Sequence, residues 1–114
     1  MVHYIPRFGD FVYIAFDPQS GHEQKGRRPA LVTSNSLFNQ KTGMAFVCLV
    51  TSTVRGNPFH LPIPTQNSVT GVVMVDQIKS VDYASRNVEL IAPAPESLVA
   101  DVVSLLNTIL EERF

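Results

Sequence analysis

Short apolar segments separated by turn-forming residues recur along the first 92 positions of the chain. The segments cover 10–16, 29–34, 44–51, 59–63, 71–78 and 87–92. Runs of this length, rich in branched and aromatic side chains and bounded by Gly, Pro and Asn, predict β-strands. Several are apolar on both alternate faces, as expected for a small sheet that curls around its own core. A short helical turn is expected over 34–40.

The end of the chain has a helical period instead. One stripe contains Leu98, Val102, Leu105 and Ile109, and an adjacent stripe contains Val99, Val103, Leu106 and Leu110. Pro95 suits the first turn of a helix, where its missing N–H would be unpaired anyway. The wide apolar face favours packing on the sheet, with a share in a subunit interface as the alternative. The pattern predicts a single, mainly β domain over 1–114, a small antiparallel barrel followed by a C-terminal α-helix.

Composition narrows the class of protein. With 114 residues, 45% apolar and 17% charged, the chain is expected to form one ordinary globular domain. It has no run of eighteen apolar residues and no signal-peptide pattern at its N-terminus, so we expect a cytoplasmic protein without a membrane segment. Its one cysteine, Cys48, lies in an apolar run and is interpreted as a small buried hydrophobe.

Charge is distributed unevenly along the chain. Residues 1–60 carry six Lys/Arg and three Asp/Glu, whereas residues 61–114 carry three and seven, so the halves are +3 and −4. The net charge of −1 argues against nonspecific coating of nucleic acid, which depends on neutralising many phosphates. The asymmetry fits either a local basic groove or a mixed solvated surface.

Common metal and cofactor motifs are absent from the sequence. His3, His22 and His60 lie far apart and without the spacing of a metal site. The six glycines are scattered, and no segment has the spacing of a serine-hydrolase elbow. We therefore expect neither a metal ion nor a cofactor.

The loop before the second predicted strand gathers polar side chains of several kinds: His22, Glu23, Gln24, Arg27 and Arg28. Because Arg28 precedes Pro29, its backbone is restrained to an extended form. That restraint suits an arginine that must bind a phosphate with both arms of its guanidinium. The alternative is a structural arginine that pairs with a carboxylate such as Asp76.

Two further polar segments interrupt or end apolar strands. Thr51 and Ser52 lie at the end of the predicted strand 44–51, where hydroxyls either bond nearby backbone or donate to an anionic oxygen. Asp76 and Gln77 interrupt the apolar run that begins at 71. A carboxylate inside a strand pattern is costly unless it is paired, so a partner for Asp76 is expected.

Together these segments resemble one family, the MazF/PemK-like toxins of bacterial toxin–antitoxin modules. The matching runs, in the family's order, are GDFVYIAFDPQSGHEQKGRRPALVTS, FNQKTGMAFVCLVTST, GNPF, GVVMVDQIKSVD and APESL. The resemblance implies an SH3-like barrel of the CcdB/PemK type with a C-terminal helix, assembled as a homodimer. It also implies a sequence-specific endoribonuclease that cuts single-stranded RNA without metal, leaving a 2′,3′-cyclic phosphate and a 5′-hydroxyl.

The same resemblance implies roles for individual residues. Arg28 and Thr51 match the catalytic arginine and threonine, with Ser52 beside them; Glu23, Gln24 and Gln77 match RNA-site positions; His22 and Asp76 match residues with active-site roles in some members. Some members carry an arginine two places before the aspartate, where this chain has Met74. A mechanism that needs that second arginine does not transfer to this chain.

The chemistry of RNA cleavage suggests a role for each candidate residue. Arg28 suits the developing negative charge but not proton abstraction, because its guanidinium stays protonated. His22 suits the general base by its ordinary pKa, with desolvated Glu23 or Asp76 as alternatives.

For base recognition, the loops 17–28 and 53–60 offer exposed polar and aromatic side chains. The candidates are Gln24, Arg27, Arg55, Asn57 and Phe59. Phe59 is expected in the core because it begins a predicted strand, and His3 and His60 are interpreted as ordinary residues.

The resemblance also implies partners and rivals. The partner would be an acidic MazE/PemI-like antitoxin whose disordered tail occupies the RNA groove, and operator DNA would be bound only together with that antitoxin. One rival is a non-enzymatic toxin of the same fold that binds DNA gyrase. Those toxins end in Trp-Gly-Ile, whereas this chain has no tryptophan and ends in Glu-Glu-Arg-Phe. A second rival is a family member that has lost its activity.

Overall fold

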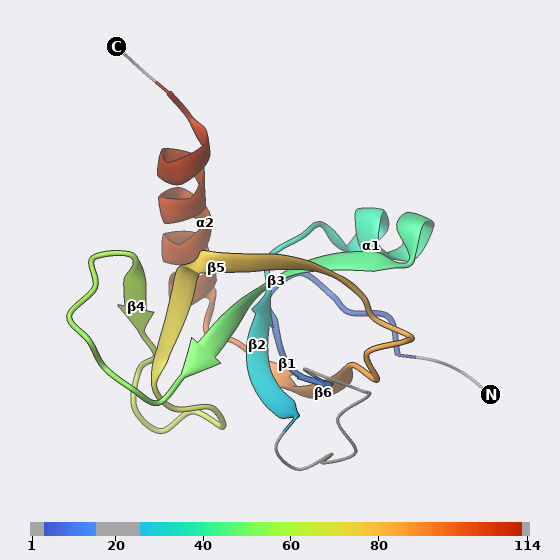
Figure 1. Cartoon of the computed structure of the whole chain (residues 1–114), viewed down its shortest axis with the longest axis horizontal. Helices are drawn as coiled ribbons and strands as arrows, with labels where there is room; N and C mark the ends of the chain where they lie inside the picture. Colours follow the sequence, from blue (N-terminus) through green and yellow to red (C-terminus); the bar gives the residue numbers. More distant parts are fainter. Residues whose placement is uncertain (1–3, 16–25, 113–114) are drawn as a thin grey trace.

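A six-stranded antiparallel sheet forms most of the molecule in the computed structural model, which describes residues 4–15 and 26–112. The strands are β1 (Asp10–Ala15), β2 (Arg27–Val32), β3 (Met44–Thr51), β4 (His60–Pro62), β5 (Val72–Asp82) and β6 (Glu89–Pro93). Their order across the sheet is β4-β5-β3-β2-β1-β6, with α1 (Ser36–Thr42) between β2 and β3 and α2 (Glu96–Leu110) at the end (Figure 1). The mainly β fold with a C-terminal helix is thus confirmed.

The bounds of β4 and β6 differ from the prediction by one or two residues, and the differences in β2 and β5 bear on the site. β2 begins at Arg27, two residues before the predicted start. Its Pro29 is tolerated because the ladder to β3 begins only at Ala30, so Pro29 lies where the strand has one bonded neighbour. β5 continues past Asp76 and Gln77 to Asp82, and it bends on the way (Figure 1). The β3–β5 ladder shifts register between Cys48 and Val50, which is the kind of irregularity that bends a strand.

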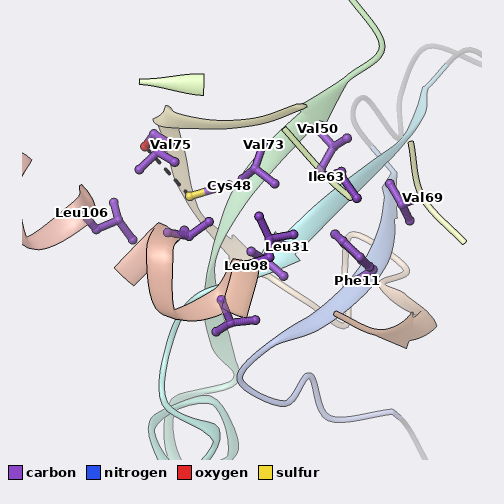
Figure 2. Packing of buried hydrophobic residues seen from close by; sticks show 12 residues of the cluster. Phe11, Leu31, Cys48, Val50, Ile63, Val69, Val73, Val75, Leu98 and Leu106 are labelled. Carbon is purple, nitrogen blue, oxygen red and sulfur yellow. Dashed lines mark hydrogen bonds between the residues drawn. The ribbon is translucent and has the colours of Figure 1, made fainter. Parts of the chain in front are cut away.

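Side chains alternate between the two faces of the sheet and build two clusters. The first cluster lies between the sheet and α2 and includes Phe11, Leu31, Cys48, Leu98 and Leu106 (Figure 2). The second lies on the other face and includes Val12, Ala30, Val32 and Val47, all of which are fully buried. This alternation follows from the two-residue period of a strand. Cys48 is buried, as predicted.

The two helices differ in the contacts that hold them in place. α2 buries Leu98, Val99, Val102 and Leu106 against the first cluster, whereas Ile109 and Leu110 at its end are exposed. The packing of α2 on the sheet is therefore confirmed, with Pro95 as the residue just before the helix. α1 begins at the capping side chain of Asn35, which accepts from the backbone N–H groups of Leu37 and Phe38. Within the described part of the chain, neither helix is long and apolar enough to cross a membrane.

Candidate functional site

The start of β2 and the end of β3 form one wall of a polar pocket. Ala30 pairs with Leu49, and continuing this antiparallel register by two residues brings Arg28 level with Thr51. The pocket has a volume of about 400 Å³ and is lined by Tyr13, Arg27, Arg28, Pro29, Val50, Thr51, Ser52, Ser68, Val69 and Thr70. The fold therefore brings Arg28, Thr51 and Ser52 together from separate segments.

Arg27 is held at the rim of this pocket by two contacts. Its guanidinium lies 4.1 Å from the ring centroid of Tyr13, and its Nη2 lies 3.3 Å from Oε1 of Glu89. Contacts of the first kind are cation–π interactions, in which a planar guanidinium stacks on an aromatic face. The side chain is still 47% exposed, so Arg27 presents a fixed positive charge to a ligand in the pocket.

Thr51 and Ser52 are positioned by their backbone neighbours. The backbone N–H of Thr53 donates to Oγ1 of Thr51 at 3.2 Å, so the hydroxyl ends the strand by a local bond, as one alternative predicted. In that bond Oγ1 is the acceptor, so the hydroxyl hydrogen of Thr51 can still be donated to an anionic oxygen. On the other side Gly71, with φ of +111°, passes so close that a Cβ there would lie 2.2 Å from the carbonyl oxygen of Thr51.

Asp76 and Gln77 lie on β5 and are not among the residues that line this pocket. Thr51 pairs with Val72, and Asp76 is four residues further along β5, roughly 13 Å at the rise of a strand. Its carboxylate Oδ1 is 3.4 Å from Nε2 of His60, and its side chain is 36% exposed. The exposure does not provide the desolvation that a base role for Asp76 requires.

The loop between β3 and β4 contains the other candidates for base recognition. Arg55 is exposed, and the side-chain oxygen of Asn57 accepts from the backbone N–H of Phe59 at 2.8 Å. Phe59 is 39% exposed, so the prediction of a core position was wrong. It lies in the turn before β4, which begins only at His60.

Three lining residues had no role in the sequence interpretation: Tyr13, Ser68 and Thr70. Tyr13 lies two residues after Phe11 and so shares its face of β1, but Tyr13 is 36% exposed whereas Phe11 is buried, so the alternation alone did not mark it. No local signal marks Ser68 or Thr70, since their place depends on the path of the segment between β4 and β5. His22, Glu23 and Gln24 lie outside the described residues. Among the described residues, no group of His, Cys, Asp and Glu could hold a metal ion.

Comparison with known families gives a match over most of the chain. Residues 7–110 match the family of PemK-like, MazF-like toxins of type II toxin–antitoxin systems. The endoribonuclease toxin MazF of Escherichia coli K12 is 35% identical over 106 residues, which are 90% of this chain and 95% of that protein. The endoribonuclease toxin ChpB of the same organism is 38% identical over 108 residues, which are 90% of this chain and 92% of ChpB.

Solved structures agree with the sequence comparisons. A crystal structure of MazE-MazF from Deinococcus radiodurans aligns with a TM-score of 0.84 at 38% identity, covering 95% of this chain and 97% of that one. A crystal structure of MazF from the same organism aligns with a TM-score of 0.83 at 44% identity, covering 95% and 98%. The chain therefore belongs to the PemK-like, MazF-like toxins of type II toxin–antitoxin systems, a family in which its relatives from E. coli are endoribonucleases.

Proposed function

We propose that this chain is a toxin that cuts single-stranded RNA at a short recognised sequence, by metal-independent transesterification that leaves 2′,3′-cyclic phosphate and 5′-hydroxyl ends. The observation that carries the proposal is the convergence of Arg28, Thr51 and Ser52 on one polar pocket. The endoribonuclease relatives at 35–38% identity support the reaction class.

The proposed reaction needs stabilisation of the negative charge that develops on the phosphorane. Arg28 provides a permanent positive charge at the strand end, and the hydroxyls of Thr51 and Ser52 provide donors beside it. A donor that is already oriented toward this charge stabilises the transition state without reorganisation during the reaction. The leaving 5′-oxygen takes up a proton from the protonated base or from water, while the guanidinium of Arg28 donates a hydrogen bond to it.

The reaction also needs a base for the 2′-hydroxyl proton. His22 is our assignment, because the ordinary imidazole pKa lies closest to neutral pH. Glu23 is the alternative in the same loop. Glu23, Gln24, Arg27, Arg55, Asn57 and Gln77 are proposed to contact RNA outside the reacting phosphate.

The proposal includes two protein partners. An acidic MazE/PemI-like antitoxin would place a disordered tail in the basic pocket, and MazE-MazF complexes among the similar structures support such a partner. A second copy of the chain would form a homodimer, supported by exposed apolar side chains on neighbouring elements. Phe38 on α1 and Phe46 on β3 lie 5.3 Å apart by ring centroids, and Ile78 on β5 is also exposed. Operator DNA is expected to bind only through the antitoxin.

The proposed activity is tested by incubating the purified protein with a long single-stranded RNA in EDTA and mapping the new 5′ ends. Arg28→Ala is compared with Arg7→Ala, because Arg7 is an exposed arginine outside the pocket lining. We expect cuts at one short recurring sequence, with 5′-hydroxyl ends, in the wild type and in Arg7→Ala but not in Arg28→Ala. An absence of cuts in the wild type would contradict the proposal and favour the gyrase-binding or inactive alternatives.

A further inference from the structure

The imidazole of His60 is buried, and it has no role in the proposed reaction. Its side chain is only 8% exposed, and its Nε2 lies 3.4 Å from Oδ1 of Asp76. Its Nδ1 is buried and has no hydrogen-bond partner among the described residues. A buried polar group of this kind usually has a specific reason to be there.

The neutral imidazole with its proton on Nε2 fits both nitrogen environments. That tautomer directs an N–H toward Asp76 and leaves Nδ1 as an acceptor only, whereas an imidazolium would bury a second, unpaired N–H. One oxygen of the Asp76 carboxylate therefore has a fixed neighbour in the buried imidazole, while the rest of the carboxylate stays available as an acceptor.

The part of the Asp76 side chain that does not contact His60 faces solvent. The side chain is 36% exposed, and its position in β5 lies between Val73 and Ile78, where the β3–β5 ladder shifts register. Its Oδ1 lies beside His60, at the end of the loop 53–60. The N–H of Val75, next to Asp76, donates to the carbonyl of Phe59 at 3.0 Å, and within the loop the N–H of His60 donates to the carbonyl of Asn57 at 3.0 Å. The backbone of β5 beside Asp76 is thus bonded directly to the end of this loop.

A fixed carboxylate recognises a different part of RNA from the arginines. It repels phosphates, but it accepts hydrogen bonds from the amino groups of cytosine, adenine and guanine bases. Uracil has no amino group, and its one base donor, N3–H, lies between two carbonyl oxygens that repel a carboxylate, so such a site discriminates most strongly against uracil. The separation of roughly 13 Å from the level of Thr51 puts the contact at a neighbouring nucleotide rather than at the cleaved phosphate.

We propose that His60 is a positioning residue that orients Asp76 to accept a hydrogen bond from a base amino group, at a nucleotide beside the cleavage site. The inference rests on the proposed function, because it assigns specificity to an RNA that the chain is proposed to cut. His60 acts through Asp76, since its own side chain is too buried to contact RNA.

The test maps cleavage of a random-sequence RNA pool by the wild type and four variants. Asp76→Asn replaces one acceptor oxygen by a donor. His60→Leu removes the donor but fills its volume, His60→Gln keeps an N–H at the Nε2 position, and Leu61→Met repacks the neighbouring position of β4 as the control. The thermal midpoint of each variant is measured to check that it is folded.

We expect Asp76→Asn and His60→Leu to reduce discrimination against uracil at the same single position, by about tenfold. The double variant should lose no more than either single one, because both act on one contact. His60→Gln and Leu61→Met should keep the wild-type preference.

Two outcomes would overturn the inference. One is unchanged base preference in His60→Leu, and the other is an equal loss of rate for all sequences, which indicates a structural role. If His60→Leu does not fold, Asp76→Asn decides, and an unchanged preference in that variant overturns the inference. Absence of cleavage by the wild type contradicts the proposed function instead, so the two failures are distinguishable.

Discussion

The hydroxyl of Thr51 is the residue-scale feature that is easiest to separate from folding. Valine has nearly the shape of threonine and suits a strand end, but it offers no donor to a developing charge. It also removes the acceptor of the Thr53 N–H, which is exposed and can bond water instead. Loss of one oriented donor typically lowers the chemical rate by about 10²–10³-fold. We therefore expect Thr51→Val to lower the single-turnover cleavage rate by that factor while Thr51→Ser retains most of it. Equal rates for the valine variant and the wild type would contradict a catalytic role for Thr51.

Gly71 is predicted to position Thr51 through direct backbone contact. Gly71→Ala would add a Cβ 2.2 Å from the carbonyl oxygen of Thr51, so the segment must shift. Gly43→Ala is the matched control, because Gly43 also has positive φ, +73°, but has no atom within 4 Å of a Cβ. We expect the control to lose about 1–2 kcal/mol of unfolding free energy through backbone strain alone.

The Gly71 variant should lose more stability than the control and, unlike it, should lose cleavage activity. Denaturant unfolding and single-turnover cleavage, measured on both variants, separate the two effects. Full activity in a folded Gly71→Ala protein would show that the Thr51 backbone does not depend on this contact.

Sequence patterns identified part of the pocket and missed another part for a physical reason. Arg28 and Thr51–Ser52 are marked locally, by a following proline and by the end of an apolar strand. Ser68 and Thr70 are polar residues in a connecting segment, and only the folded path of that segment brings them to the pocket. The sequence also gave a reason to expect a partner for Asp76, but the identity of that partner, His60, depends on the pairing of β4 with β5.

At the scale of elements, α2 stabilises the fold through one face. Leu98 is 4% exposed and packs in the first cluster, whereas Leu110 is 76% exposed at the end of the same helix. We expect Leu98→Ala to lower the free energy of unfolding by about 2–5 kcal/mol. Leu110→Ala should change it by less than about 0.5 kcal/mol. Urea denaturation of both variants tests this, and equal effects would contradict the packing of α2 described above.

The central strand β3 contains a titratable group in the first cluster. Burial raises the pKa of the Cys48 thiol from 9.0 to about 12; the nearby charge of Asp76 adds to the rise and a hydrogen bond with Thr33 opposes it. Between about pH 9 and 12 the unfolded chain therefore loses this proton while the folded protein keeps it. The free energy of unfolding should fall in this range, by at most about 1.4 kcal/mol for each pH unit.

Cys48→Ala isolates that contribution, because other groups titrate equally in both proteins. The variant should be less stable than the wild type at pH 7, through the cavity that it leaves. The difference in unfolding free energy should then narrow as the pH rises from 9 to 11. A difference that stays constant with pH would mean that Cys48 ionises equally in the folded and unfolded states.

Strand positions were largely predictable, and the exceptions are informative. Apolar runs identify strands whose side chains are buried, so β1 and β3 were found nearly in full. The end of β5, residues 79–82, was missed because Lys79 and Ser80 are exposed and interrupt the apolar pattern. Its strand conformation comes from pairing with β3, where Val47 lies opposite Lys79 and Phe46 opposite Ser80. Such pairing is a property of the sheet and not of the segment.

At the scale of the whole molecule, the arginines of the pocket and the acidic residues near the C-terminus lie on different elements. The pocket presents Arg27 and Arg28, whereas α2 contributes Glu96 and Asp101 and is followed by Glu111 and Glu112, at the other end of the chain. A net charge of −1 thus coexists with a local positive pocket. This arrangement favours anionic ligands at one place without general attraction to nucleic acid.

An acidic antitoxin tail and RNA should therefore compete for the pocket, with the same dependence on salt. We expect the dissociation constant of a fluorescently labelled acidic tail peptide to rise about tenfold or more between low and high salt, because screening weakens exposed charge pairs. Arg27→Ala should bind the peptide more weakly, with a smaller dependence on salt, since it removes one of the exposed positive charges and leaves the carboxylate of Glu89 unpaired at the pocket rim. Fluorescence anisotropy over a salt series measures both constants, and the same peptide should inhibit RNA cleavage more weakly as salt is added. Affinity that does not change with salt would mean that the tail binds mainly through apolar contacts, outside this pocket.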